Sequence, residues 1–236
     1  MNSTRPSGAA GVTGAIDSVE PTTPVAPAAY GPTIADVVDL GAWPALSQTP
    51  AMAWSSLVKR DFSGRDGDLV PIKGWPTALK FDGQVTYLWW GQDIDNEDRA
   101  AARAGRLYTF ASEADCWAMA DAKGWAADGD PADQELVVAT DLEPAQEWLR
   151  GRRMALDPKA GLNLWNWATD AAYSTGRPWS DRGGRRDDCY DKLFAANVPW
   201  AFGIESYRPR WNPRQLRTLR QVLSQAVHLL RAAMRG

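Results

Sequence analysis

The sequence has one histidine, His228, and two cysteines, Cys116 and Cys189, among its 236 residues. Histidine is the usual acid, base or metal ligand near neutral pH, so its scarcity argues against familiar proton-transfer chemistry. His228 lies in a predicted helix beside apolar neighbours and is interpreted as a structural or surface residue. The cysteines have neither metal-ligand spacing nor the number that a disulfide framework needs. The sequence therefore predicts no catalytic residue, no metal site and no cofactor.

Several familiar signatures are also missing. There is no glycine-rich dinucleotide loop, P-loop, nucleophile elbow, zinc-protease motif or paired Cys-x-x-Cys. The apolar runs are too short to cross a bilayer, and no apolar signal region opens the chain. Together with two unpaired thiols, these absences favour a cytoplasmic protein.

Tryptophan and an uneven charge distribution are what the chain does have. The 13 tryptophans indicate either buried core anchors or exposed aromatic contact surfaces. Residues 1–150 carry 11 Lys and Arg against 22 Asp and Glu, whereas residues 151–236 carry 15 against 7. The first part therefore has a net charge of −11 and the second of +8. This asymmetry indicates either that the two parts dock on each other or that the protein has a charged partner.

The composition divides the chain into a tail and one domain. Residues 1–32 contain almost no large apolar side chains and are expected to form a disordered tail. Residues 33–236 are expected to form a single globular α+β domain, with a mixed acidic part at 33–150 and a helical basic part at 151–236. The first part is expected to hold a small antiparallel sheet of three to four strands together with helices.

Local patterns predict the individual elements. Asp82-Gly83 separates two β-forming runs and predicts a type I′ hairpin turn. In the second strand, Tyr87 and Trp89 are expected on one face and Leu88 and Trp90 on the other, both covered. The expected elements are loose helical pieces at 33–62, a turn-rich link at 63–76, hairpin strands at 78–81 and 84–90, strands at 106–110 and 136–139, and helices at 112–123, from 143, at 159–174, at 187–196 and from 213 almost to the C-terminus.

An acidic stretch follows the hairpin. Asp93, Asp95, Glu97 and Asp98 are spaced somewhat like the alternating carboxylates of a calcium loop, but the sixth position lacks glycine and the twelfth lacks glutamate. A solvated loop and a contact surface for a basic partner remain as interpretations, and these four residues are the candidate partner-binding set.

The predicted helix at 159–174 is apolar on two sides with a polar strip between them. That strip faces solvent, joins a buried hydrogen-bond network or lines a ligand pocket. The next helix begins with acidic residues. The candidate pocket residues are Asn163, Trp165, Asn166, Trp167, Asp170 and Asp191.

Five stretches of the sequence, within residues 84–211, carry a resemblance: VTYLWWGQDID, GRLYTFASEADCWAMADAKGW, GLNLWNWATDAAYSTG, DDCYDKLFAANVPW and YRPRW. Together they resemble a group of uncharacterised small actinobacterial proteins, with the YDKLF piece the most specific. That group has no established activity, so the resemblance implies no site residues. In size and style the chain is also loosely similar to immunity proteins of bacterial toxin systems.

Three functions are compatible with these observations. The leading hypothesis is a non-enzymatic cytoplasmic protein-binding module, of the immunity type, whose acidic first part covers a basic toxin or another basic protein. One alternative is a defence or regulatory protein whose basic C-terminal helices contact nucleic acid. The other is an enzyme with a tryptophan-lined carboxylate pocket around Asp170. No membrane partner is expected.

Overall fold

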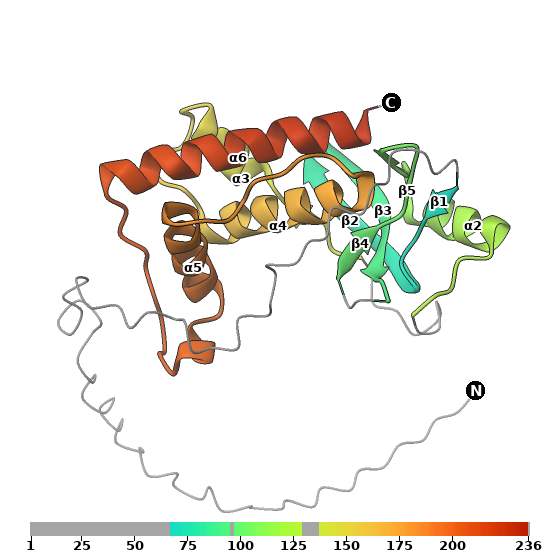
Figure 1. The fold of residues 1–236 in the computed structure, drawn as a ribbon, viewed down its shortest axis with the longest axis horizontal. Coiled ribbons are helices and arrows are strands. Elements are labelled where there is room, and N and C mark those ends of the chain that lie inside the picture. Colours follow the sequence, from blue (N-terminus) through green and yellow to red (C-terminus); the bar gives the residue numbers. More distant parts are fainter. Residues whose placement is uncertain (1–66, 95–96, 129–136, 236) are drawn as a thin grey trace, which may run out of the picture. The chain divides into compact units, whose positions relative to one another are not determined.

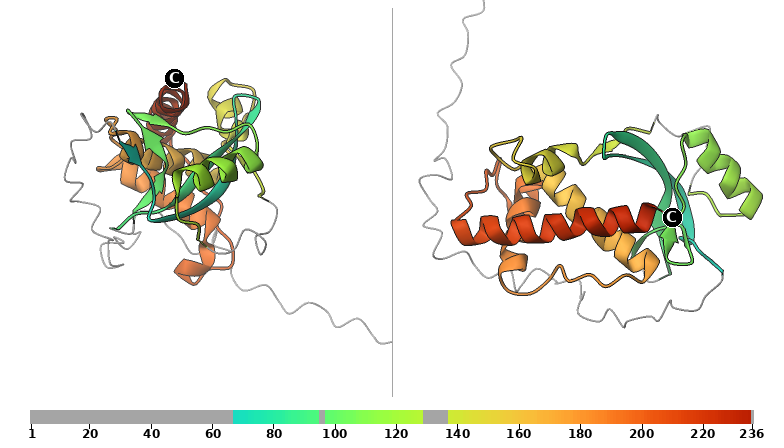
Figure 2. Two further views of the ribbon diagram at one scale, coloured as in Figure 1. Left: turned by 90° about the vertical axis from the view of Figure 1, so that its right-hand side faces the viewer. Right: turned by 90° about the horizontal axis from the view of Figure 1, so that it is seen from above.

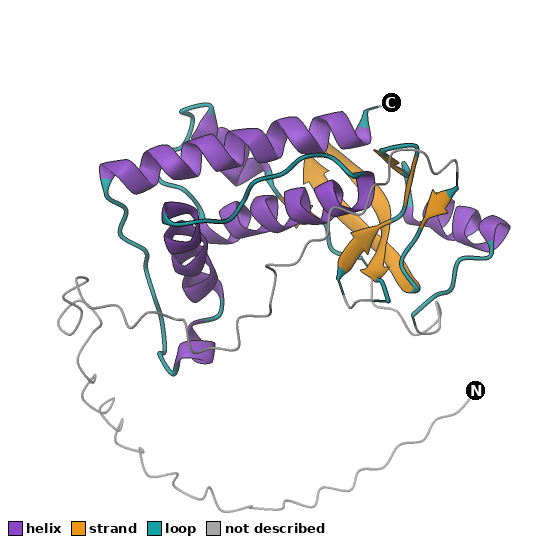
Figure 3. Ribbon diagram, in the orientation of Figure 1, coloured by secondary structure: helices purple, strands orange, loops and turns teal. Residues whose placement is uncertain are grey.

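The computed structural model describes residues 67–94, 97–128 and 137–235. The predicted tail at 1–32 and the helical pieces at 33–62 lie outside the described residues. The described residues all belong to one compact unit, Pro50–Gly236. The predicted start of the domain, residue 33, lies outside the described residues. This unit has the expected α+β architecture: the strands gather at one end and most of the helices follow in the C-terminal half (Figure 1, Figure 3).

The main sheet has the strand order β4-β3-β2-β7. Its centre is the predicted hairpin, in which β2 (Lys73–Phe81) pairs antiparallel with β3 (Gln84–Gln92). At the turn, Asp82 and Gly83 have φ of 52° and 77°, the positive values that a type I′ turn requires. β4 (Asp98–Ala100) extends the antiparallel pairing, but β7 (Thr140–Asp141) joins parallel to β2, which corrects the expected all-antiparallel sheet.

Several strand boundaries differ from the prediction, among them the end of β3, which lies at Gln92 instead of residue 90. β2 begins within the expected link, because Gly74 lets the Trp89 ring approach: a Cβ at Gly74 would lie 2.5 Å from Trp89 Nε1. The strand expected at 136–139 instead lies at Thr140–Asp141; position 136 is outside the described residues and Val138 is 86% exposed. The strand expected at 106–110 is only β6 (Arg106–Leu107) and a bridge at Phe110. β6 completes a second sheet, β1-β5-β6, with β1 (Asp68–Leu69) and β5 (Ala102–Arg103).

The two faces of the hairpin are covered as the alternating pattern predicts. Trp89 packs in a cluster with Cys116 and Ala120 of α2 (Glu113–Lys123), and Tyr87 packs against the same cluster. Leu88 belongs to the larger core on the opposite face, and Trp90 packs against it. The sheet therefore lies between α2 and the remaining helices, as Figure 1 shows.

The helices of the larger core are α3 (Glu143–Leu149), α4 (Pro158–Thr175), α5 (Arg185–Asn197) and α6 (Pro213–Met234), with a short 3-10 turn at Pro199–Phe202. Ser112, Asp157 and Asn212 accept backbone N–H groups at the starts of α2, α4 and α6. α6 packs its apolar stripe on α4 and crosses over it (Figure 2). No helix among the described residues combines the length and apolar character needed to span a membrane.

Asp82 links the acidic part of the chain to the basic part. Its carboxylate accepts two hydrogen bonds from Arg231, both 2.7 Å, and others from Arg150 and Arg235 at 3.2 Å. Gln146 adds a donor at 2.9 Å. The Arg231 hydrogen bonds are the main reason that the pKa of Asp82 falls to about 2. The two parts therefore dock through at least this cluster, one of the two interpretations of the charge asymmetry.

Candidate functional site

Two regions singled out in the sequence meet in the structure. The acidic stretch connects β3 to β4, and β4 packs against α4, which carries the polar strip. The Ala100 N–H donates to Ser174 Oγ at 3.0 Å, and the Tyr173 hydroxyl donates to Asp93 Oδ2 at 2.6 Å. Figure 1 shows β4 beside the C-terminal half of α4. The candidate partner surface and the candidate pocket helix therefore contribute to one region.

Asp93 points into this junction. It is 7% exposed and accepts hydrogen bonds from Arg99 at 2.9 Å, from the Tyr173 hydroxyl and from the Glu97 N–H at 3.3 Å. Arg99 is also buried, and its guanidinium lies 4.8 Å from the Tyr173 ring centroid. Asp93 therefore holds the loop against α4. It was predicted to lie on an exposed contact surface, but its side chain is buried. Asp95 lies outside the described residues.

Asp170 lies on α4 one turn before Tyr173 and Ser174. Its Oδ2 accepts from Trp90 Nε1 at 3.2 Å. Burial of the carboxyl group is the main reason that the pKa of Asp170 is raised from 3.8 to about 8, and the negative charges of Asp98 and Glu97 contribute to the same rise. Asp170 is therefore largely protonated at neutral pH, a rare state for an aspartate.

Among the charged neighbours of Asp170, Asp98 has the largest effect on its pKa. It is half-buried at the start of β4, and burial raises its pKa. The Gln92 amide donates to Asp98 Oδ1 at 3.5 Å. The hydrogen bonds accepted by Asp98 and Asp170 thus come from uncharged donors, so neither carboxyl group has a cationic partner among the described residues.

Trp90, which donates to Asp170, belongs to a group of packed aromatic rings. Trp75 and Trp90 face each other across β2 and β3, with ring centroids 4.9 Å apart in an edge-to-face arrangement, and both are partly exposed. The Trp167 ring lies 6.2 Å from Trp90 and is 8% exposed. Trp75, Trp90, Glu97, Asp98 and Asp170 are named here the acidic–aromatic site.

The other candidate pocket residues lie in different surroundings. Trp165 is fully buried and packs edge-to-face on Tyr190 at 5.6 Å. Asn166 accepts from the Tyr190 hydroxyl at 3.0 Å, and Asn163 is half-buried. The polar strip is therefore hydrogen-bonded to its neighbours over part of its length, one of the three arrangements considered.

Asp191 lies on α5, and burial raises its pKa. The charged neighbours that act on Asp191 are Arg182, Asp187 and Asp188, whereas those that act on Asp170 are Asp98 and Glu97. The carboxylates that the structure places in the electrostatic field of Asp170 therefore come from β4 and its preceding loop.

Sequence reasoning missed the role of Trp75 and Trp90 beside the carboxyl groups. The signal was present: once Asp82 and Gly83 form the turn, the hairpin register places Trp75 directly opposite Trp90. Arg99 and Tyr173, which hold Asp93, were missed for a different reason. The Tyr173 contact joins positions 80 residues apart, which no local pattern encodes.

The structure also bears on nucleophiles and metal ions. Cys116 and Cys189 are free and buried, and burial raises their pKa values to about 12 and about 11. His228 is exposed on α6. Within residues 67–94, 97–128 and 137–235, no group of three or more His, Cys, Asp and Glu side chains is placed to hold a metal ion.

The chain was compared with protein-family models, curated proteins and solved structures, and it matches none of them. The resemblance to small actinobacterial proteins therefore stays a prediction, and function has to be inferred from the site itself.

Proposed function

We propose that this chain is a non-catalytic binding protein whose acidic–aromatic site receives a lysine or arginine side chain of a basic protein partner. The observation that carries this proposal is the pairing of two carboxyl groups, Asp98 and Asp170, that have only neutral hydrogen-bond donors among the described residues. Burial is the main cause of the raised pKa of Asp170, and the negative charge of Asp98 adds to it, so a cation beside these carboxyl groups would favour their charged forms.

The aromatic border suits the same guest. The faces of tryptophan rings attract ammonium and guanidinium groups. The partly exposed ring of Trp90 donates to Asp170, and the partly exposed ring of Trp75 packs against Trp90. Arginine and aromatic residues are also enriched where protein interfaces gain most of their binding energy.

The partner that this chemistry fits best is a basic protein, and the specific role we propose is immunity-type inhibition of a toxin with a basic active surface. The excess of acidic over basic residues in residues 1–150 would steer such a partner toward the site. The free, buried cysteines are compatible with a reducing compartment, so we propose a cytoplasmic location.

Binding of a cation must be linked to proton release. Asp170 has to lose its proton before it can pair with the guest, and its pKa is about 8. Affinity for a cationic guest should therefore rise from about pH 6 to pH 9, by up to about tenfold per pH unit below the pKa.

The test uses the full chain and an arginine-rich peptide labelled for fluorescence anisotropy. Asp98→Asn and Asp170→Asn should each weaken binding about tenfold above pH 8, because each removes one charge next to the guest. Asp121→Asn, on the exposed surface of α2, removes the same charge elsewhere and should leave affinity unchanged.

Equal losses in all three variants would mean that only net charge matters, and absence of peptide binding would also contradict the proposal. The same variants extend the test to the proposed partner. A partner recovered by pull-down with the tagged chain should be lost with Asp98→Asn and kept with Asp121→Asn.

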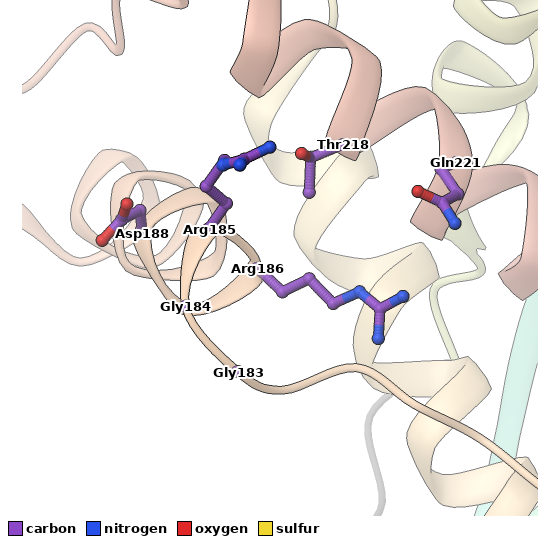
Figure 4. Close-up of a pocket in the computed structure, with 7 residues that line it drawn as sticks. All are labelled: Gly183, Gly184, Arg185, Arg186, Asp188, Thr218 and Gln221. Carbon is purple, nitrogen blue, oxygen red and sulfur yellow. The ribbon is translucent and has the colours of Figure 1, made fainter.

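The elevated pKa of Asp170 also suits a general acid, which is the observation that favours the enzyme alternative. An enzyme would need an enclosed substrate cavity at Asp170. The pocket in Figure 4 is lined by other residues, from the start of α5 and from α6. The enzyme therefore stays the second candidate function.

A further inference from the structure

A pocket of about 630 Å³ lies between the loop that precedes α5 and the N-terminal half of α6, open to solvent. Its size falls within the range of small-molecule sites in proteins. No sequence motif pointed to it, because its two walls are at least 30 residues apart in the chain. The lining residues are Gly183, Gly184, Arg185, Arg186, Asp188, Thr218 and Gln221.

Hydrogen-bond donors from two elements converge on this pocket. In Figure 4, the guanidinium groups of Arg185 and Arg186 extend from α5 toward α6, where Thr218 and Gln221 face them. The Asp188 carboxylate, the acidic group of the lining, lies on the other side of the first turn of α5 from Arg186. The space between the two walls is therefore bordered mainly by positive charge and by amide and hydroxyl groups.

The two arginines are held differently. Arg186 Nη1 donates to the backbone oxygen of Ser180 at 2.7 Å and also to the Ser180 hydroxyl, which fixes the guanidinium at the pocket wall. Arg185 is exposed and forms no hydrogen bond or ion pair with the described residues. One guanidinium is thus preorganised, and the other is available to close on a ligand.

We infer that this pocket binds a phosphate group. Guanidinium groups match the planar, multiply charged face of a phosphate with paired hydrogen bonds. The Gln221 amide adds a neutral donor from the opposite wall. The phosphate belongs either to a free nucleotide-sized molecule or to a nucleic-acid strand, because both present the same chemistry to these side chains. This inference is independent of the acidic–aromatic site.

The experiment is calorimetric titration of the full chain with two probes at about 50 mM salt: inorganic pyrophosphate and a single DNA strand of about twelve nucleotides. At least one probe should bind. Arg185→Gln and Arg186→Gln should weaken that binding about tenfold, because each removes a charge-assisted contact. Asp188→Asn should strengthen it, since a negative charge at the rim is lost.

Arg106→Gln is the matched control. Arg106 is exposed on β6, away from α5, and its replacement removes the same charge. Thermal unfolding should show that Arg185→Gln folds normally, because Arg185 has no hydrogen bond or ion pair with the described residues to lose. Binding of pyrophosphate assigns the site to a free phosphate compound, and binding of the strand alone assigns it to nucleic acid. The inference is overturned if neither probe binds, or if Arg106→Gln weakens binding as much as Arg185→Gln does.

Discussion

Replacing Asp170 by asparagine removes a carboxyl group whose pKa rises to about 8, with little change in side-chain shape. The asparagine Oδ1 can still accept the hydrogen bond from Trp90 Nε1, which the wild-type carboxyl group accepts at 3.2 Å. The variant therefore isolates the energetic effect of the charge. We expect Asp170→Asn to stabilise the fold at neutral pH and to leave its stability nearly unchanged in acid.

The sign follows from proton binding. Between about pH 4 and pH 8 the folded state keeps the Asp170 proton, and the unfolded state, with a pKa near 3.8, releases it. The unfolded state therefore binds fewer protons, so the free energy of unfolding of the wild type falls as pH rises through this window. The full shift would correspond to about 4 kcal/mol at pH 7, at 1.36 kcal/mol per pH unit. Because Asp170 is partly exposed, solvent screening reduces the expected gain in Asp170→Asn to about 2 kcal/mol.

The assay is urea unfolding, followed by tryptophan fluorescence at about pH 5, 6, 7 and 8. The difference in unfolding free energy between Asp170→Asn and wild type should grow with pH and level off above about pH 8. Asp121→Asn is the control and should show no such slope. A difference that stays constant with pH, or a variant less stable than wild type at pH 8, would refute the assignment of Asp170 as a protonated carboxyl group.

Three further outcomes are expected. Asp82→Asn should lose about 2 kcal/mol in urea unfolding by weakening the paired Arg231 contact. Because the pKa of Asp82 is lowered to about 2, its contribution to the free energy of unfolding of the wild type should disappear as pH falls from about 4 toward 2. If the unfolding free energies of wild type and Asp82→Asn fell in parallel over this range, the lowered pKa would be contradicted. Gly91→Ala should cost about 3 kcal/mol in thermal unfolding, since its Cβ would lie 2.0 Å from the Lys73 carbonyl oxygen. Cys116 should react with a thiol reagent only on unfolding, because its pKa is about 12; rapid labelling of the native chain would disprove its burial.

The elements that the sequence predicted best are those with complete local signals. The Asp82-Gly83 turn has only a few favourable conformations, and the alternating residues on either side make one register strongly preferred. α6 begins at Asn212 with a full capping box, and its apolar residues recur at spacings of three and four. In both cases, short-range geometry and burial favour the same structure.

The features that escaped prediction depend on contacts between distant positions. β7 joins the sheet through only two residues, Thr140 and Asp141, too few to leave a periodic pattern. Asp93 was predicted to be exposed because its neighbours in sequence are acidic, but Arg99 and the Tyr173 hydroxyl draw it inside. The charge environment of Asp170 comes from residues more than 70 positions earlier. Local propensity carries no information about such pairings.

The directions of the carboxyl pKa shifts separate structural charges from available ones. Asp82 has a lowered pKa because Arg231 accompanies it, which is the result expected when acidic and basic parts dock. Docking does not account for Asp98 and Asp170, whose pKa values are raised and whose hydrogen-bond donors are neutral. The charge asymmetry along the chain therefore has two components. One component is neutralised within the fold at Asp82. The other is Asp98 and Asp170, which have no cationic partner among the described residues and lie near the partly exposed ring of Trp90, where a cation from outside would gain the most binding energy.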